Sequence, residues 1–464
     1  MNNKKYNVVI VGSGFSGIAA ANRLIGNGLS ILLVDENLHI GGQLLRKLPE
    51  KLGLDKNYRP DYVKRIGNGF IEGIKSGEID ILNNSSVIGI YDNKEILIEI
   101  EKERIRSIDF DAILFATGAR ERYLPFKGWT LPGVFSAGMA QVLMKSSGVL
   151  PSKNVVVGGS GLFLFSAAYE FIKNGAKVRA VMESTGVSGK IKLLPVLLHN
   201  FSKITEGIRY VGKIGLAGVP IKFNRRIIEA RGRESLEEVV IGKTDSEGKI
   251  VIGSEKIVET DGFAYSYGFV PNVELPNLAG CKLSFDKDLG GWIVNVNDNM
   301  ESGISGVYCA GEVTGVGGAL KSINEGLTAS ISILELFDKG NEFKEEKKKL
   351  IKKRKHHLNF AKLFNSLYGI RKSEISEIPD ETIICRCEDV KMGDIRKAVK
   401  DGFTSPGALK ISLRTGMGNC QGRTCGPLIY DIFSELFLPE DNHFTIFSKR
   451  PPVKPVKIGV LVNR

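Results

Sequence analysis

A strand, a glycine-rich turn and a helix follow one another at the start of the chain, and this pattern restricts the fold more than any other feature. The apolar run 6–11 predicts a β-strand, and residues 18–24 predict a helix. Between them, the first glycine permits a tight turn, the second admits a pyrophosphate, and the third lets the helix pack closely on the strand. The residues of this turn are Gly12, Ser13, Gly14, Phe15, Ser16 and Gly17. The pattern predicts an α/β fold with a dinucleotide at the helix N-terminus.

An acidic residue follows the second predicted strand, residues 30–34. Asp35 lies 23 residues after Gly12, a spacing that suits a carboxylate bound to the adenosine ribose. Glu36 is the neighbouring alternative. Because strand, turn, helix, second strand and acid occur in order, we expect a nucleotide site here rather than a glycine turn without a ligand.

Three more segments favour FAD over NAD. They contain Gly42, Gln43, Leu44, then Ala116, Thr117, Gly118, and finally Gly311 and Glu312. Together with the first turn, they resemble the recurring segments of the two-dinucleotide-binding-domain flavoproteins, the class of thioredoxin reductase and glutathione reductase. The resemblance implies that Glu312 hydrogen-bonds the ribityl chain. It also implies that a helix beginning near Gly318 and Ala319 points at the flavin ring.

A second copy of the pattern begins at the predicted strand 154–157. It contains Gly159 and Gly161, and Glu183 follows Gly159 by 24 residues. The family resemblance makes this an NAD(H) domain inserted between two halves of the FAD domain. However, Leu164 occupies the third glycine position, and we expect it to push the helix away from the strand and disturb the pyrophosphate seat. The alternatives are therefore NAD(H), another adenine nucleotide, or a domain kept only as scaffold.

Four cysteines near the C-terminus form a C-x-C pair and a C-x4-C pair: Cys385, Cys387, Cys420 and Cys425. Four thiolates are the ligand set of a [2Fe-2S] cluster. Zinc is the alternative, but zinc sites usually separate paired cysteines by two to four residues. Glycines around the second pair can bring backbone amides toward the sulfurs. Cys281 and Cys309 lie outside the pattern and are expected to be small buried side chains.

The segments CRCEDV and TGMGNCQGRTCGP closely resemble the bacterioferritin-associated-ferredoxin type of [2Fe-2S] domain. The resemblance implies a small helical module, with helices near 392–400, 406–414 and 427–437. The cysteine spacing is unlike a disulfide framework, so reduced thiols are expected.

The net charge of +12 is concentrated in one run, residues 344–357. An apolar stripe through this run and a stop at Gly369 predict a solvated connecting helix. A docking face for an acidic partner or for the membrane surface is the alternative. No nucleic-acid motif is recognisable. No apolar run is long enough to cross a bilayer, so we expect a cytoplasmic protein that associates with membranes, if at all, through its partners.

Across nearly its full length the chain resembles one family, the larger electron-transfer subunits of opine oxidase, hydrogen cyanide synthase, and heteromeric proline and hydroxyproline dehydrogenases. The resemblance rests also on GARERYLPFKGWTLPGVFSAG, YGFVPN and RPPVKPV. It implies a hetero-oligomer with a D-amino-acid-oxidase-like FAD subunit, and in many cases a small ferredoxin-like subunit. No general acid-base set is visible, which favours a relay of electrons over substrate chemistry on this chain. The alternatives are a self-sufficient NAD(P)H-dependent reductase and an iron-sensing or docking module.

The expected architecture has two Rossmann-like dinucleotide-binding domains and a small helical [2Fe-2S] domain. A chain of 464 residues is too long for one small core and should divide into about three domains. The predicted boundaries are 1–127 with 261–339 for FAD, 128–260 for the NAD(P)-like domain, 340–379 for a helical linker, 380–438 for the cluster module, and 439–464 for an extended tail rich in proline.

Overall fold

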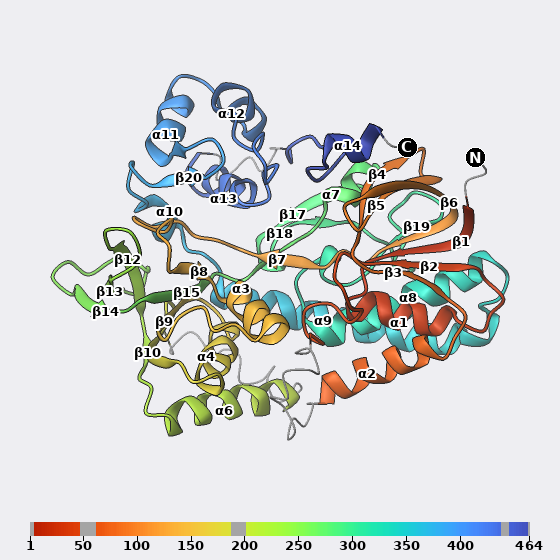
Figure 1. Cartoon of the computed structure of the whole chain (residues 1–464), viewed down its shortest axis with the longest axis horizontal. Helices are drawn as coiled ribbons and strands as arrows, with labels where there is room; N and C mark the ends of the chain where they lie inside the picture. The colour runs from red at the N-terminus through yellow and green to blue at the C-terminus, as the bar shows by residue number, and fades with distance from the viewer. Residues whose placement is uncertain (1–3, 47–61, 187–200, 438–444, 463–464) are drawn as a thin grey trace.

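A mixed sheet, a parallel sheet and a C-terminal helical module form the main parts of a computed structural model of the chain, which describes residues 4–46, 62–186, 201–437 and 445–462 (Figure 1). The first sheet runs in the order β3-β2-β1-β6-β5-β4, with β19 also paired to β6. Its strands are β1 (Lys4–Val11), β2 (Ile31–Val34), β3 (Asp80–Leu82), β4 (Ser85–Tyr91), β5 (Glu95–Ile100), β6 (Arg104–Phe115) and β19 (Val307–Cys309). Strand β19 pairs with Ile113–Phe115 of β6, so a segment almost 200 residues downstream completes this sheet.

Strand β1 is buried on both faces, as a central parallel strand must be. Val8 and Ile10 share a core with the helices α1 (Phe15–Leu24), α2 (Tyr62–Lys75) and α8 (Ala319–Leu336). Val9 and Val11 face the opposite core, which includes the hairpin β4-β5. The alternation follows from the two-residue period of a strand.

The second sheet is formed by the inserted part of the chain and runs β11-β10-β9-β15-β8. Its strands are β8 (Val134–Ser136), β9 (Asn154–Gly159), β10 (Lys177–Glu183), β11 (Ile221–Phe223) and β15 (Gly262–Ser266). The helices of this part are α3 (Ala137–Val142), α4 (Phe163–Lys173) and α6 (Phe201–Leu216). A three-stranded antiparallel sheet lies beside it, formed by β12 (Arg225–Arg231), β13 (Glu238–Lys243) and β14 (Lys256–Glu259).

Short elements join the two sheets and carry the cluster module. Antiparallel pairs are formed by β7 (Ala119–Glu121) with β16 (Phe269–Pro271), and by β17 (Leu283–Asp286) with β18 (Gly291–Val294); α7 (Glu274–Leu278) lies between them in the chain. In Figure 1 the C-terminal module lies above β7, β17 and β18. Its elements are β20 (Ile383–Cys385), β21 (Val390–Lys391), α11 (Met392–Lys400), α12 (Pro406–Leu413) and α13 (Cys425–Ile432), followed by a π-helical turn at Phe433–Phe437. The three expected helices are present, and the last begins two residues earlier than predicted.

The connecting helix α9 (Lys344–Tyr368) ends directly before Gly369, as predicted, and a short helix α10 (Lys372–Ser376) follows. The helix is less solvated than its charge suggested. Lys347 is buried and pairs with Glu335 at 2.5 Å, and Arg354 is largely buried. The basic run therefore contributes two of its cations to the interior, because α9 packs along α8, where the partly exposed Glu335 and the buried Glu325 pair with them.

The C-terminal tail is only partly extended. Residues 445–457 form no helix or strand, as the prolines predicted, but the last described residues form α14 (Ile458–Val462). The prediction of a tail without helix was wrong there, because the last proline is Pro455 and the segment IGVLV contains none. Residues 438–444 lie outside the described residues. The domain boundaries themselves remain predictions.

Candidate nucleotide and cluster sites

Two of the three glycines in the first glycine turn are packed too closely for a larger residue. Gly12 has φ +103°, and a Cβ atom there would lie 2.3 Å from the carbonyl oxygen of Ala116. A Cβ on Gly17 would lie 1.9 Å from the carbonyl oxygen of Gly12. A Cβ on Gly14 would meet open space. The first and third glycines thus allow neighbouring backbone segments to pack closely. The second glycine leaves the backbone accessible, as a pyrophosphate would require.

The predicted segments converge on this turn. Gly42 lies against Gly14, since a Cβ on Gly42 would be 2.8 Å from the Gly14 Cα. Gly311 lies against Ser16, whose Oγ would be 2.5 Å from a Cβ at position 311. The Gln43 side chain accepts a hydrogen bond from Arg46 at 2.9 Å, and Leu44 is half exposed. Four stretches that are far apart in the sequence therefore surround one helix N-terminus.

Helix α1 suits an anionic ligand. It has no capping side chain and no acidic residue in its first turn, so its N-terminal amides face no negative charge of their own helix. Asp35 is buried and accepts hydrogen bonds from the Ser13 amide and hydroxyl, both at 2.6 Å, and from the Asn37 amide at 2.8 Å. Asp35 therefore shapes the turn, and its contact with a ribose remains a prediction. Glu36 is exposed and forms an ion pair with Lys454 of the tail.

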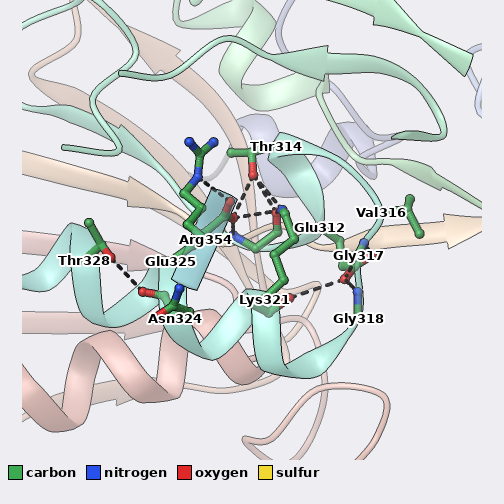
Figure 2. Close-up of polar contacts among 12 residues, drawn as sticks. Glu312, Thr314, Val316, Gly317, Gly318, Lys321, Asn324, Glu325, Thr328 and Arg354 are labelled. Atoms are coloured by element: carbon green, nitrogen blue, oxygen red, sulfur yellow. Dashed lines mark hydrogen bonds and ion pairs between the residues drawn. The ribbon is translucent and has the colours of Figure 1, made fainter. Parts of the chain in front are cut away.

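Glu312 lies at the N-terminus of α8. Its carboxylate accepts hydrogen bonds from the amides of Gly318, at 2.7 Å, and Gly317, at 3.2 Å (Figure 2). Burial raises the pKa of Glu312, while Lys321 and the two amides oppose the increase. Gly318 caps α8, which begins at Ala319 as expected. A flavin ring at this helix terminus would have to share these amides with Glu312.

A buried ionic network supports this loop, and sequence reasoning missed it. Lys321 is fully buried, and its ammonium donates to Glu325 at 2.9 Å and to the Gly311 carbonyl at 2.8 Å (Figure 2). Glu325 also accepts from the Gly311 amide at 2.9 Å and from Arg354 at 2.8 Å. Burial alone would raise the pKa of Glu325, but Lys321 and Arg354 hold it below its usual value. The available signal was a lysine and a glutamate four residues apart in a helix whose one other charged residue is Glu335.

The second glycine turn resembles the first, but residues from other parts of the same chain contact it where a ligand would bind. Glu183 is fully buried, and its carboxylate accepts from the Gly161 amide at 3.0 Å. Gly161 is the counterpart of Gly14, whereas within the first glycine turn the shorter Asp35 accepts from Ser13 and not from Gly14. Ser160 donates to the carbonyl of Tyr368, at the end of α9, at 2.9 Å. A negative charge and the end of the connecting helix thus lie where a dinucleotide would approach.

Leu164 changes the second site less than expected. Its side chain is fully buried in the core of the second sheet, with Val155 and Val157. The start of α4 adapts, because the amides of Leu164 and Phe165 bond carbonyls three residues back, those of Gly161 and Leu162, at 3.2 Å. The corresponding first bond of α1, from Ile18 to Gly14, spans four residues. The first turn of α4 therefore has the tighter three-residue hydrogen bonding of a 3-10 helix, and the helix stays packed on the sheet.

The four predicted cluster cysteines lie together. Sulfur contacts link Cys387 to Cys420, Cys420 to Cys425, and Cys425 to Cys385. The contacts connect the four sulfurs one after another and do not place them around a common centre. In the described parts of the molecule, no set of three or more His, Cys, Asp or Glu side chains is arranged to hold a metal ion. The structure thus brings the four thiols into one group, and their role as ligands remains a prediction. Cys281 and Cys309 are buried elsewhere, as expected.

Backbone amides point at the cysteine sulfurs. The hydrogen bond from Cys425 lowers the pKa of Cys420 to about 4, and the Thr424 amide adds to this effect. The pKa of Cys385 is lowered to about 6, first by Cys425 and then by three amides, including that of Gly416. A Cβ on Gly418 would lie 2.2 Å from the Cys387 Cβ. These donors fit thiolates at Cys385 and Cys420, as an iron-sulfur cluster requires, whereas the contacts between the sulfurs raise the pKa of Cys387 and Cys425.

Glu121, at the end of β7 between the two sheets, is a buried carboxyl whose role the sequence did not suggest. It accepts a hydrogen bond from the Gly138 amide at 2.9 Å, at the start of α3. Burial raises its pKa to about 7, although hydrogen bonds from Ser136 and from the Gly138 amide oppose the increase. A Cβ on Gly138 would lie 2.6 Å from its carboxylate. Glu121 therefore connects the crossover strand to the second sheet.

The raised pKa of Glu121 predicts a pH dependence of stability. The folded pKa lies above the unfolded value of 4.5, so the folded state binds the proton more tightly, and the corresponding stability is lost as the pH rises from about 4.5 to about 7. The loss amounts to about 3 kcal/mol. The Glu121→Gln variant should flatten the fall of thermal stability between pH 5 and 7.5. Glu259→Gln, at an exposed site, is the control, and equal slopes in the wild type and Glu121→Gln would contradict the assignment.

Comparison with known proteins bears on both sites. Residues 6–330 match the family model described as pyridine nucleotide-disulphide oxidoreductase. Hydrogen cyanide synthase subunit HcnB of Pseudomonas aeruginosa is 31% identical over 90% of this chain and 90% of that protein. An opine oxidase subunit of Rhizobium meliloti is 29% identical over 99% of this chain and 87% of that protein. The chain belongs to the family of these two proteins.

Further matches agree with this family. Residues 383–435, which include all four cysteines, match the BFD-like [2Fe-2S] binding domain. The crystal structure of L-proline dehydrogenase from P. horikoshii superposes with a TM-score of 0.70 at 19% identity, over 99% of this chain and 80% of that one, and so shows the same fold. The predicted α/β fold class is confirmed, as are FAD and a [2Fe-2S] cluster as the cofactors that the family implies. Like its relatives, the chain is a subunit of a heteromeric enzyme.

No helix in the described ranges has the length and apolar character needed to span a bilayer.

Proposed function

We propose that this chain is the FAD- and [2Fe-2S]-carrying subunit of a heteromeric dehydrogenase for amino or imino acids. In this proposal a D-amino-acid-oxidase-like partner oxidises the carbon-nitrogen bond, and this chain takes up the electrons; a small ferredoxin-like subunit completes the assembly. Bound FAD would supply two-electron chemistry and the cluster one-electron chemistry. The relatives support the substrate class, since their names include hydrogen cyanide synthase and opine oxidase subunits.

One observation carries the proposal: the cysteine loop lies against the nucleotide-binding part. Arg120, two residues after Gly118, donates to the carbonyl of Arg423 at 3.1 Å, inside the loop that joins Cys420 to Cys425. The proposed cluster ligands are therefore fixed to the strand that leaves the proposed flavin site. Such proximity allows electron transfer between two redox centres, whereas an isolated iron sensor would not require it.

The proposed roles of individual residues follow from the geometry. Gly12–Gly17 would hold the pyrophosphate, Asp35 or Glu36 the ribose, and Glu312 with Gly318 the ribityl and ring end of FAD. The four cysteines would hold the two irons. The remaining predicted FAD residues, Gly42, Gln43, Leu44, Ala116, Thr117, Gly118, Gly311 and Ala319, would line the site.

The substrate can be identified with the complete assembly. We expect purified protein with its co-expressed partners to show flavin reduction with one compound among proline, hydroxyproline, sarcosine, glycine and opines. The chain purified alone should not be reduced by any of them, because in this proposal the partner subunit oxidises the carbon-nitrogen bond. Rapid reduction of the isolated chain would show that substrate oxidation occurs here, and would refute the division of labour.

The main alternative, an NAD(P)H-dependent reductase, predicts the opposite response to nicotinamide. We expect NADH and NADPH at micromolar concentration to leave the flavin absorbance of the isolated chain unchanged in a stopped-flow experiment. The reason is that Glu183 and the end of α9 already contact the second glycine turn. Dithionite is the positive control, because it should bleach the same sample. Bleaching by NADH within seconds would favour the reductase.

A further inference from the structure

Three charged side chains surround the carbonyls of the loop that joins Cys420 to Cys425. Arg120 reaches the carbonyl of Arg423 from the nucleotide-binding part, and Lys449 of the tail donates to the carbonyl of Gln421. Glu274, at the start of α7, pairs with Arg120 at 3.0 Å and is buried. The three belong to different segments, and they meet at a cavity of about 30 Å³ that Arg120, Glu274, Tyr430 and Lys449 help to line.

Arg120 also connects this loop to the proposed flavin site. Its Nη1 donates to the side chain of Asn272 at 2.7 Å. Asn272 in turn donates to the Thr117 carbonyl at 2.9 Å, and the Thr117 hydroxyl donates to the Asn272 carbonyl at 2.7 Å. A single guanidinium and a single amide thus span the distance from the cysteine loop to the Ala116–Gly118 segment.

The charges around the loop do not balance. Arg120, Lys449 and Arg423 supply three positive charges, and among the described residues Glu274 is the one carboxylate that forms an ion pair with them; Glu36 also acts on Arg423 but is itself paired with Lys454. Burial lowers the pKa of Lys449 to about 8, so its ammonium remains largely charged at neutral pH. Burying cations costs free energy, and a neighbouring negative charge offsets that cost.

We propose that Arg120 and Lys449 position the loop 420–425 and raise the reduction potential of the cluster, and that Glu274 lowers it. Uptake of one electron adds one negative charge to the group of thiolates and irons, and no bond is formed or broken. Buried cations beside the loop favour that added charge, and a buried carboxylate opposes it. The inference rests on the proposed function, because it requires the cluster to be bound by these cysteines.

The test is a dithionite titration of the full-length, cofactor-loaded protein, followed by the paramagnetic signal of the reduced cluster. Lys449→Gln and Arg120→Gln should shift the midpoint to more negative potential, by tenfold or more in the equilibrium constant, which is about 59 mV for one electron. Glu274→Gln should shift it to more positive potential. Lys449→Arg should keep the wild-type midpoint. Arg414→Gln is the matched control, because Arg414 also lies near the cysteines but is exposed and pairs with Glu388.

Opposite signs for Lys449→Gln and Glu274→Gln would distinguish a tuning role from a general loss of structure. Midpoints that are unchanged, or that move in the same direction in both variants at full iron content, would overturn the inference. If Arg120→Gln loses iron, the other two variants still decide the question, since they act at different points of the loop. A wild-type protein without any cluster signal would instead defeat the proposed function, so the two failures are distinguishable.

Discussion

Replacing Cys420 with alanine is expected to abolish iron binding and leave the flavin in place. Iron should fall from about two atoms per chain to near zero, and the signal of the reduced cluster should disappear, because three thiolates cannot complete the ligand set. Cys385→Ala and Cys425→Ala should behave alike, since the sulfurs of both contact the same group. The measurement is the iron, sulfide and flavin content of the purified variants.

Cys281→Ala is the matched control for this series. Cys281 is buried in the core that includes Val9, Val11 and the hairpin β4-β5, away from the four cluster cysteines, and contacts Cys309. The control should keep its iron, although it loses some stability through the lost packing. A Cys420→Ala protein with full iron content would show that the cluster is held elsewhere.

The second large effect concerns the stability of the nucleotide-binding part. Lys321→Met should lower the free energy of unfolding by about 3–5 kcal/mol, because it leaves the fully buried Glu325 without one of its two cations. The same change removes the hydrogen bond to the Gly311 carbonyl, so flavin should be released more easily. In a urea titration followed by flavin fluorescence, the midpoint should fall by about 1 M or more.

Lys348→Met provides the comparison. Lys348 pairs with Glu345 on the exposed face of α9, with more than two thirds of each side chain accessible. Such a pair is worth less than about 1 kcal/mol, so its loss should barely move the midpoint. A double variant, Lys321→Met with Glu325→Gln, should recover part of the loss, because the uncompensated carboxylate is gone. A loss below about 1 kcal/mol for Lys321→Met would mean that Arg354 alone is sufficient for Glu325.

Local patterns in the sequence were enough to predict the parts of the fold that depend on local physics. The Gly12–Gly17 turn, the strand before it and the helix after it follow from glycine conformations and from hydrophobic periodicity. The same holds for the end of α9 before Gly369, whereas the bounds of α11, which are those predicted, were implied by the resemblance to the ferredoxin-type domain. The C-x-C and C-x4-C spacings were enough to predict that the four cysteines form one group.

Contacts between distant segments could not be predicted in this way. The bond between Arg120 and the cysteine loop spans 303 residues, and the bond between Arg354 and Glu325 spans 29. No periodicity encodes such distances. The effect of Leu164 was misjudged for a related reason, since a third glycine is required only if the helix starts with the same geometry as α1. In the second site the first turn of α4 has tighter hydrogen bonding, and the Leu164 side chain packs in the core of the second sheet.

The pairing of β19 with β6 has a consequence for synthesis of the chain on the ribosome. Until residues 307–309 emerge, the second half of β6 lacks its neighbour on one side, and α8 is not yet available to cover β1. The inserted sheet, in contrast, is complete once β15 has emerged at residue 266. The middle of the polypeptide can therefore mature before its beginning, and the N-terminal strands must wait with an exposed edge that is prone to pair with other chains.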